Sequence, residues 1–159
     1  MSDPTTITAY LSRDHDRLDA LLAQIYEHAS KGDLVAAGGP FAEFADGLVR
    51  HMRIEEQSLF GEFERRTGML SGPTQVLRTE HRALEHALDR MRAALAAADA
   101  EVFVRGHDDL VEILVAHHLK EEEVLYPMAL RSLPESDDSD QRDATSSSTG
   151  RVAARSSGV

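Results

Sequence analysis

The sequence contains no cysteine, which excludes disulfide bonds, thiolate-ligated zinc, iron–sulfur clusters and cysteine nucleophiles together. Tryptophan is also absent, and aromatic residues make up only 5% of the chain. No apolar run approaches the ~20 residues that a membrane-spanning helix needs. Residues 1–22 do not combine a basic flank with an apolar run, as a signal peptide does. We therefore expect a cytoplasmic protein with no membrane partner.

Positive charge is scarce, with 17 Lys and Arg residues against 28 Asp and Glu residues and a formal net charge of -11. An acidic surface repels the phosphate backbone of nucleic acids, and no basic stripe with interleaved aromatic residues offsets this repulsion. Nucleic-acid binding is therefore not expected. Most of the acidic side chains are interpreted as a solvated helical surface.

Apolar residues recur at alternating steps of three and four in four segments, which is the pattern of amphipathic helices. Capping and helix-opening residues predict starts at Asp3-Pro4, Gly39-Pro40 and Gly72-Pro73, with a fourth near Asp99. Pro127 falls in the last turn of the fourth helix and should kink or fray it. Short connections make neighbouring helices antiparallel. The predicted fold is all-α, an up-down-up-down four-helix bundle.

The composition changes from about Pro134 onward, where Ser, Thr, Asp, Gly and Arg dominate and apolar periodicity disappears. Such a segment cannot bury enough apolar surface to fold. We expect one bundle domain over residues 1–133 and a disordered tail over residues 134–159.

A single pattern occurs twice, 66 positions apart, so the bundle is predicted to be two related hairpins. The apolar frame repeats at pairs that include Leu11/Leu77, Leu18/Leu84, Leu48/Leu114 and Phe60/Tyr126. Ionisable residues repeat inside that frame: His15/His81, His51/His117 and Glu55/Glu121. Ionisable side chains on a buried face are costly unless a partner satisfies them. Four His and two Glu converging on one core therefore indicate a metal site.

The residue types of this site restrict the metal. Imidazole and carboxylate ligands without sulfur favour iron or manganese over a structural zinc ion, with zinc as an alternative. Two carboxylates on opposed helices are suited to bridging two cations. Without a metal, at least one of the two would have to be protonated in the low-dielectric core.

The chain resembles the hemerythrin-like, or HHE cation-binding, family. The motifs are His15 on the first helix, His51-x3-Glu55 on the second, His81 on the third and His117-x3-Glu121 on the fourth, followed by Leu125-Tyr126-Pro127. The resemblance covers about residues 5–131. It implies two non-haem iron ions, oxo- or hydroxo-bridged, with the four His as terminal ligands and the two Glu as bridges.

Oxygen-carrying hemerythrins have a His-x3-His pair on the third helix, whereas here Glu85 stands four residues after His81. We include Glu85 among the candidate metal ligands; its neighbour His86 is less well placed. Counting two nitrogens per iron leaves both irons open unless Glu85 or His86 fills one position. This count argues against an oxygen carrier, because such carriers rely on one saturated and one open iron. His118 points about 100° away from His117 and is expected on the helix flank or behind the ligands. Tyr126 is expected to pack at the bundle end, as Phe60 does in the other half.

Three functions fit this interpretation. The first is a diiron protein that binds or senses small oxidants or gases (dioxygen, nitric oxide or hydrogen peroxide) or iron itself. The second is a diiron enzyme that disproportionates peroxide or oxidises iron. The third is a metal-free helical interaction module, and the sequence does not separate the first two.

Overall fold

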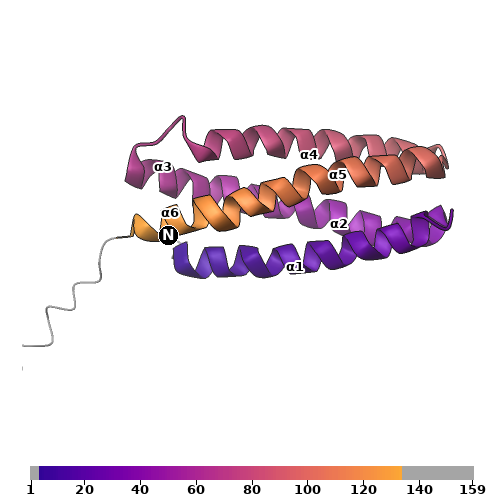
Figure 1. Ribbon diagram of the computed structural model, residues 1–159, viewed down its shortest axis with the longest axis horizontal. Coiled ribbons are helices and arrows are strands. Elements are labelled where there is room, and N and C mark those ends of the chain that lie inside the picture. Colours follow the sequence, from indigo (N-terminus) through magenta and orange to yellow (C-terminus); the bar gives the residue numbers. More distant parts are fainter. Residues whose placement is uncertain (1–3, 134–159) are drawn as a thin grey trace, which may run out of the picture.

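The computed structural model describes residues 4–133, and in this range the chain forms four helical rods and no strand (Figure 1). The first rod is α1 (Pro4–Ala29) and the third is α4 (Pro73–Ala96). The second rod joins α2 (Leu34–Ile54), a π-helical turn η1 (Glu55–Phe60) and α3 (Gly61–Thr67). The fourth joins α5 (Ala100–Lys120), a second π-helical turn η2 (Glu121–Leu125) and α6 (Tyr126–Arg131). The predicted four-helix bundle is confirmed.

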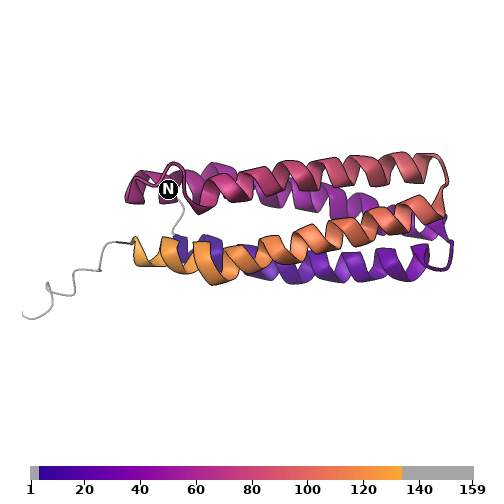
Figure 2. The same ribbon diagram turned by 45° about the horizontal axis from the view of Figure 1, so that its top comes forward.

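The rods pack as two antiparallel hairpins, α1 with α2 and α4 with α5 (Figures 1 and 2). The hairpins meet through α1 against α5 and α2 against α4. The π turns begin at Glu55 and Glu121, which are equivalent positions of the sequence repeat, so the repeat extends to this backbone irregularity. Periodicity at steps of three and four did not predict these turns, because they add one residue to a single turn only.

The helix starts agree with the sequence prediction at Pro4, at Pro73 after Gly72 and at Ala100 after Asp99. The predicted start of the second helix at Gly39-Pro40 is wrong, because α2 begins at Leu34. Asp33 caps this earlier start by accepting a hydrogen bond from the Ala36 N–H at 3.0 Å. Pro40 then lies inside α2, and Gly39 before it has no Cβ to clash with the proline ring.

The helix continues past Pro127 as α6, which ends at Arg131. In the π turn just before it, the Tyr126 N–H donates to the Glu121 carbonyl, five residues back. Pro127 therefore sits where the regular i→i−4 ladder is already interrupted. Asp3 and the tail predicted over residues 134–159 lie outside the described residues.

The core has two apolar clusters with a polar layer between them. The larger cluster contains Leu18, Leu48, Leu84 and Leu114, one from each rod. The smaller contains Leu11, Leu59, Leu77 and Leu125, again one from each rod. The repeated His and Glu residues occupy the positions between these leucines on every rod, so the polar layer crosses the bundle at one level.

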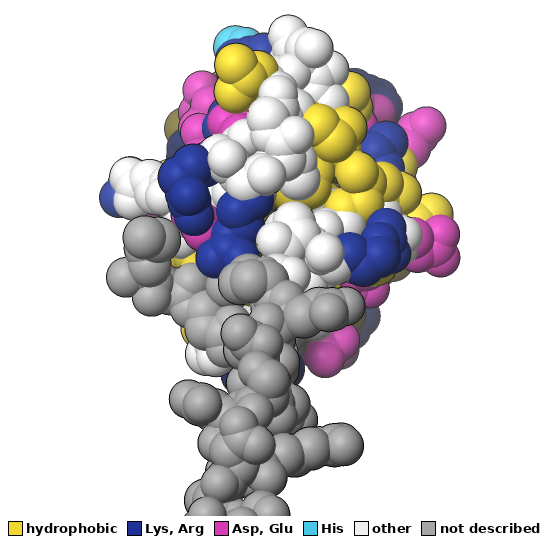
Figure 3. Space-filling view, turned by 90° about the vertical axis from the view of Figure 1, so that its left-hand side faces the viewer, with side chains coloured by type: hydrophobic (Ala, Val, Ile, Leu, Met, Phe, Trp, Pro, Cys, Tyr) yellow, Lys and Arg dark blue, Asp and Glu magenta, His cyan; other side chains and the backbone are white. Residues whose placement is uncertain are grey.

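The end of the bundle at which α1 begins and α6 ends exposes hydrophobic side chains beside positively charged ones (Figure 3). Met69 and Leu70, in the loop after α3, are exposed at this end. No helix within residues 4–133 combines the length and the hydropathy of a membrane span.

Candidate metal centre

Six of the seven predicted ligands meet in the polar layer. His15, His51, His81 and His117 come from the four different rods and are at most 3% exposed. Glu55 and Glu121 are fully buried at the first positions of η1 and η2. Ionisable groups this deeply buried require compensating partners.

The donor atoms form two groups, in each of which all atoms lie within 4.8 Å of one another. The first group is His15, His51, His118 and Glu121, and the second group is Glu55, His81, His117 and Glu121. Every member of both groups is buried.

Each glutamate spans the two groups with its two oxygens. Glu55 places Oε1 3.2 Å from His51 Nε2 and Oε2 3.2 Å from His81 Nε2. Glu121 places Oε2 3.3 Å from His15 Nε2 and Oε1 3.1 Å from His117 Nε2. Each carboxylate therefore faces one imidazole from the first hairpin and one from the second. Two bridging carboxylates need this arrangement.

Every one of the four predicted His ligands has a carboxylate behind it, on its Nδ1 atom. The pairs are His15 with Glu122 at 2.8 Å, His51 with Asp14 at 3.0 Å, His81 with Glu56 at 2.7 Å and His117 with Glu80 at 3.0 Å. An ionised carboxylate only accepts hydrogen bonds, so Nδ1 carries the proton and donates. The Nε2 lone pair of each ring is then directed into the polar layer, as in metal-binding histidines.

Two of these four outer carboxylates (Asp14, Glu56, Glu80 and Glu122) are also held by cations. Arg17 donates to Asp14 at 2.8 Å, and Lys120 donates to Glu80 at 2.6 Å. Burial opposes ionisation of Asp14, but its hydrogen bonds with Arg17 and His51 outweigh burial and lower its pKa. Both carboxylates are thus kept charged and oriented toward the imidazoles.

The atoms that face one another across the polar layer are mostly hydrogen-bond acceptors. His15 Nε2 and His51 Nε2 are 3.2 Å apart, although both rings carry their proton on Nδ1. The Nε2 atoms of His81 and His117 and both oxygens of Glu121 are buried without a hydrogen-bond partner. Two atoms bound to one metal at about 2.1 Å lie about 3.0–3.4 Å apart for angles from 90° to tetrahedral. The donor atoms present therefore fit a metal ion in each group.

The carboxylate pair shows the electrostatic cost of the layer. Burial raises the pKa of Glu121 well above its usual value of 4.5, and the neighbouring charge of Glu55 raises it further. Burial also opposes ionisation of Glu55, but the imidazoles of His51 and His81 that face it lower its pKa well below 4.5. In the absence of cations the pair shares one proton, as the sequence analysis expected.

His118 occupies a different place from the one expected from the sequence. Its ring stacks on His15 with centroids 3.6 Å apart, and one of its ring nitrogens belongs to the first group. The buried Nε2 of this ring has no hydrogen-bond partner. Burial, assisted by nearby His15 and His117, lowers the pKa of His118 to about 2, so the ring is neutral and able to bind a metal. Its counterpart in the other copy of the repeat is Met52, so the repeat gave no signal for this residue.

Tyr126 packs in the smaller apolar cluster, as expected, but its hydroxyl also reaches the polar layer. The hydroxyl donates to Glu55 Oε1 at 3.3 Å and lies 3.5 Å from His15 Nε2. Phe60, its repeat counterpart, stacks on His81 with centroids 5.5 Å apart. Each aromatic follows its repeated glutamate by five residues, Phe60 after Glu55 and Tyr126 after Glu121. A π turn brings residue i+5 one turn below residue i, whereas a regular helix would rotate it by about 140°.

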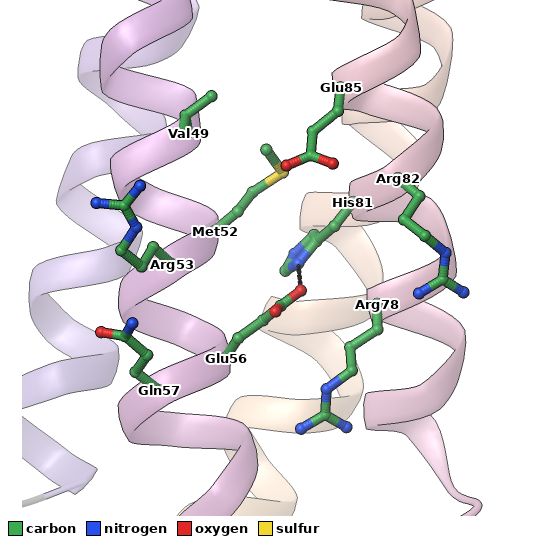
Figure 4. Close-up of a pocket in the computed structure, with 9 residues that line it drawn as sticks. All are labelled: Val49, Met52, Arg53, Glu56, Gln57, Arg78, His81, Arg82 and Glu85. Carbon is green, nitrogen blue, oxygen red and sulfur yellow. Dashed lines mark hydrogen bonds and ion pairs between the residues drawn. The ribbon is translucent and has the colours of Figure 1, made fainter.

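Glu85, the seventh predicted ligand, lies outside both groups. It is exposed and lines a pocket beside His81 (Figure 4). His86 is also exposed and lies in neither group. Metal binding by Glu85 stays a prediction.

The outer carboxylates were not assigned from the sequence, although a signal for them was available. Asp14 and Glu80 are counterparts in the repeat, and each directly precedes a repeated His. Glu56 and Glu122 are also counterparts, and each directly follows a repeated Glu. Repeated ionisable residues next to repeated ligands therefore indicated the outer positions.

We expect Glu122→Gln to weaken metal binding by about 10–100-fold, because an amide holds the His15 ring less firmly than a carboxylate does. Isothermal titration of the metal-free protein with Fe²⁺ under anaerobic conditions measures this affinity. Glu123→Gln is the matched control, since Glu123 is exposed, adjacent and outside both groups. Equal affinities of the two variants would contradict the role assigned to Glu122.

The bundle and its buried His/Glu groups fit a metal-binding four-helix domain. The sequence profile of the Hemerythrin HHE cation binding domain matches residues 6–129, and the chain belongs to this family. The resemblance inferred from the sequence motifs is thereby confirmed. No curated protein and no solved structure is similar enough to the chain to count as a match.

Proposed function

We propose that the domain binds two iron ions and that this centre binds or senses small oxidants or gases such as dioxygen, nitric oxide or hydrogen peroxide. The observation that carries the proposal is the set of buried acceptor atoms facing one another at 3.1–3.3 Å. Lone pairs at this separation repel unless a proton or a metal ion lies between them, and two metal ions would satisfy all of these atoms at once. Imidazole and carboxylate without sulfur favour iron among the available cations.

The first group would hold one ion through His15, His51 and His118, and the second group would hold the other through His81 and His117. Glu55 and Glu121 would contribute one oxygen to each ion. A bound iron pair supplies redox and Lewis-acid chemistry. The protein orients the imidazoles through the outer carboxylates and shields the centre between its two apolar clusters.

The two positions are unequal in the proposed centre, with three nitrogens at one and two at the other. The ligand count made from the sequence assigned two nitrogens to each iron, because His118 was not included. With His118, the first group would offer its iron one ligand more than the second group offers, and because Glu85 lies outside both groups, the vacant position would be at the second group. The geometry therefore supports reversible binding of a small ligand at one iron, which the sequence-based count had argued against.

A diiron enzyme that disproportionates peroxide or oxidises iron is the second candidate, and Tyr126 favours it. A buried phenol that donates a hydrogen bond to Glu55 places a hydrogen-bond donor next to the centre, where it could stabilise charge on a bound oxidant. Burial, with the nearby charges of Glu121 and Glu55, raises the pKa of Tyr126 above its usual value, so the phenol stays protonated. The metal-free interaction module gains no support from the buried acceptor atoms.

Metal content and optical absorption of protein expressed in iron-replete medium test the proposal. About two irons per chain with near-ultraviolet charge-transfer bands is the expected result. Hydrogen peroxide added next separates the candidates. Sustained oxygen release indicates the enzyme, and a single stoichiometric spectral change indicates the binding or sensing protein. A folded protein that acquires no metal would overturn both.

A further inference from the structure

A pocket of about 380 Å³ opens between α2 and α4 beside the second group (Figure 4). Its lining comprises Val49, Met52, Arg53, Glu56, Gln57, Arg78, His81, Arg82 and Glu85. His81 belongs to the second group, and Glu56 accepts a hydrogen bond from its Nδ1. The pocket therefore reaches from the surface to a residue of the metal centre.

The internal repeat provides a reference for this pocket within the same molecule. Every lining position has a counterpart in the other copy of the repeat, between α1 and α5 beside the first group. The lining of the pocket has three arginines and two glutamates. The counterpart positions have no Lys or Arg and four acidic residues: Asp16, Asp19, Glu122 and Glu123. In a chain with a net charge of -11, positive charge is thus concentrated on one of two equivalent faces.

Two of the three guanidinium groups are free of ion pairs with other described residues. Arg78 is bound to Glu64 at 2.5 Å and is neutralised by it. Arg53 forms no ion pair within residues 4–133, and Arg82 donates only to the Thr79 hydroxyl, at 3.0 Å. Glu56 is engaged by His81, which leaves Glu85 as the one carboxylate of the lining without an ion pair in the described part of the chain. Free positive charge therefore exceeds free negative charge among the lining residues, with the Arg53 and Arg82 side chains directed outward on either side of the pocket (Figure 4).

The inner end of the pocket differs from its counterpart in one residue. Met52 stands where the first group has His118, so no imidazole fills the corresponding position at the second group. The Met52 side chain points into the pocket toward Glu85 (Figure 4). A methionine side chain is unbranched and adapts its shape easily. Met52 therefore fills the inner end of the pocket, but it can change its rotamer to let a small ligand pass.

We propose that this pocket is the route by which small anions reach the vacant position of the second group, and that Arg53 and Arg82 set the preference for negative charge. The inference rests on the proposed diiron function and specifies its ligand class. Positive side chains at the mouth of a cleft raise the local concentration of anions and speed their association.

Azide binding to the diferric protein tests this inference, with iron content measured first on every sample. The double variant Arg53→Gln/Arg82→Gln should retain iron and bind azide roughly tenfold more weakly at low ionic strength. Nitric oxide, an uncharged probe, should bind the ferrous forms of both proteins equally. The matched control is Arg92→Gln/Arg105→Gln, which changes the net charge equally at arginines that do not line the pocket.

A second variant tests the vacant position directly. Met52→His offers the second group the imidazole that His118 offers the first, and we expect it to keep both irons but to lose azide binding by more than about tenfold. Full iron content with unchanged azide affinity in both test proteins would overturn this inference alone. Absence of iron from the unsubstituted protein would overturn the proposed function and this inference with it.

Discussion

His51→Ala and Glu121→Ala are each expected to lose most of the bound iron, with affinity falling by more than about 100-fold. His51 supplies one of the nitrogens of the first group, and Glu121 supplies an oxygen to both groups. Removing a ligand costs more than removing the outer carboxylate behind it, which itself lowers affinity by about 10–100-fold. Metal analysis after dialysis against a weak chelator measures the retained iron per chain.

His28→Ala is the control for these two variants. His28 lies in the last turn of α1, is part of neither group, and should retain the full iron content when replaced. Circular dichroism establishes that all three proteins keep the helical bundle. Equal iron content in the three folded proteins would contradict the assignment of ligands.

Glu121→Gln is expected to make the metal-free protein more stable at neutral pH while preventing it from binding metal. The raised pKa of Glu121 means that the folded protein binds its proton more tightly than the unfolded chain does. The stability contributed by that proton is complete below about pH 4.5 and is lost as pH rises toward the raised pKa. Glutamine is neutral at every pH and avoids this loss.

The free energy of unfolding of Glu121→Gln should therefore exceed that of the unsubstituted protein. This difference should grow by about 1.4 kcal/mol for each pH unit above ~4.5, up to the raised pKa of Glu121. Urea unfolding of the two metal-free proteins between pH 4.5 and 8 measures it. The other titrating groups are common to both proteins and largely cancel in the difference. A difference that does not change with pH would show that Glu121 is already ionised in the metal-free fold. With iron present, the unsubstituted protein should be the more stable of the two, because iron stabilises only the protein that binds it.

The fold was predictable from the sequence because it depends on local patterns. Apolar residues at steps of three and four fix which face of each helix is buried, whatever its neighbours are. Gly72, Pro73 and Asp99 marked two of the helix starts by their own backbone preferences. The start of α2 was misplaced because Pro40 was interpreted as a first-turn proline. The cap at Asp33 and the absence of a Cβ at Gly39 allow the helix to begin earlier.

The candidate ligands were predictable wherever they obeyed the repeat. His15, His51, Glu55, His81, His117 and Glu121 all repeat, and the structure brings these six together. His118 and Tyr126 break the symmetry, because their counterparts are Met52 and Phe60. Their contribution to the polar layer depends on contacts between helices distant in sequence, such as the stacking of His118 on His15.

The sequence by itself determined the bundle, the two-hairpin repeat, the family and the six residues of the polar layer, because periodicity and repetition are properties of the chain alone. Only the tertiary structure decided that the two donor groups are unequal, with three histidines in the first and two in the second. The π turns rotate Tyr126 toward Glu55, His118 fills one side of the layer, and the counterpart side opens into a pocket with free arginines. These features depend on distances and directions between side chains of different helices, which helical periodicity does not fix.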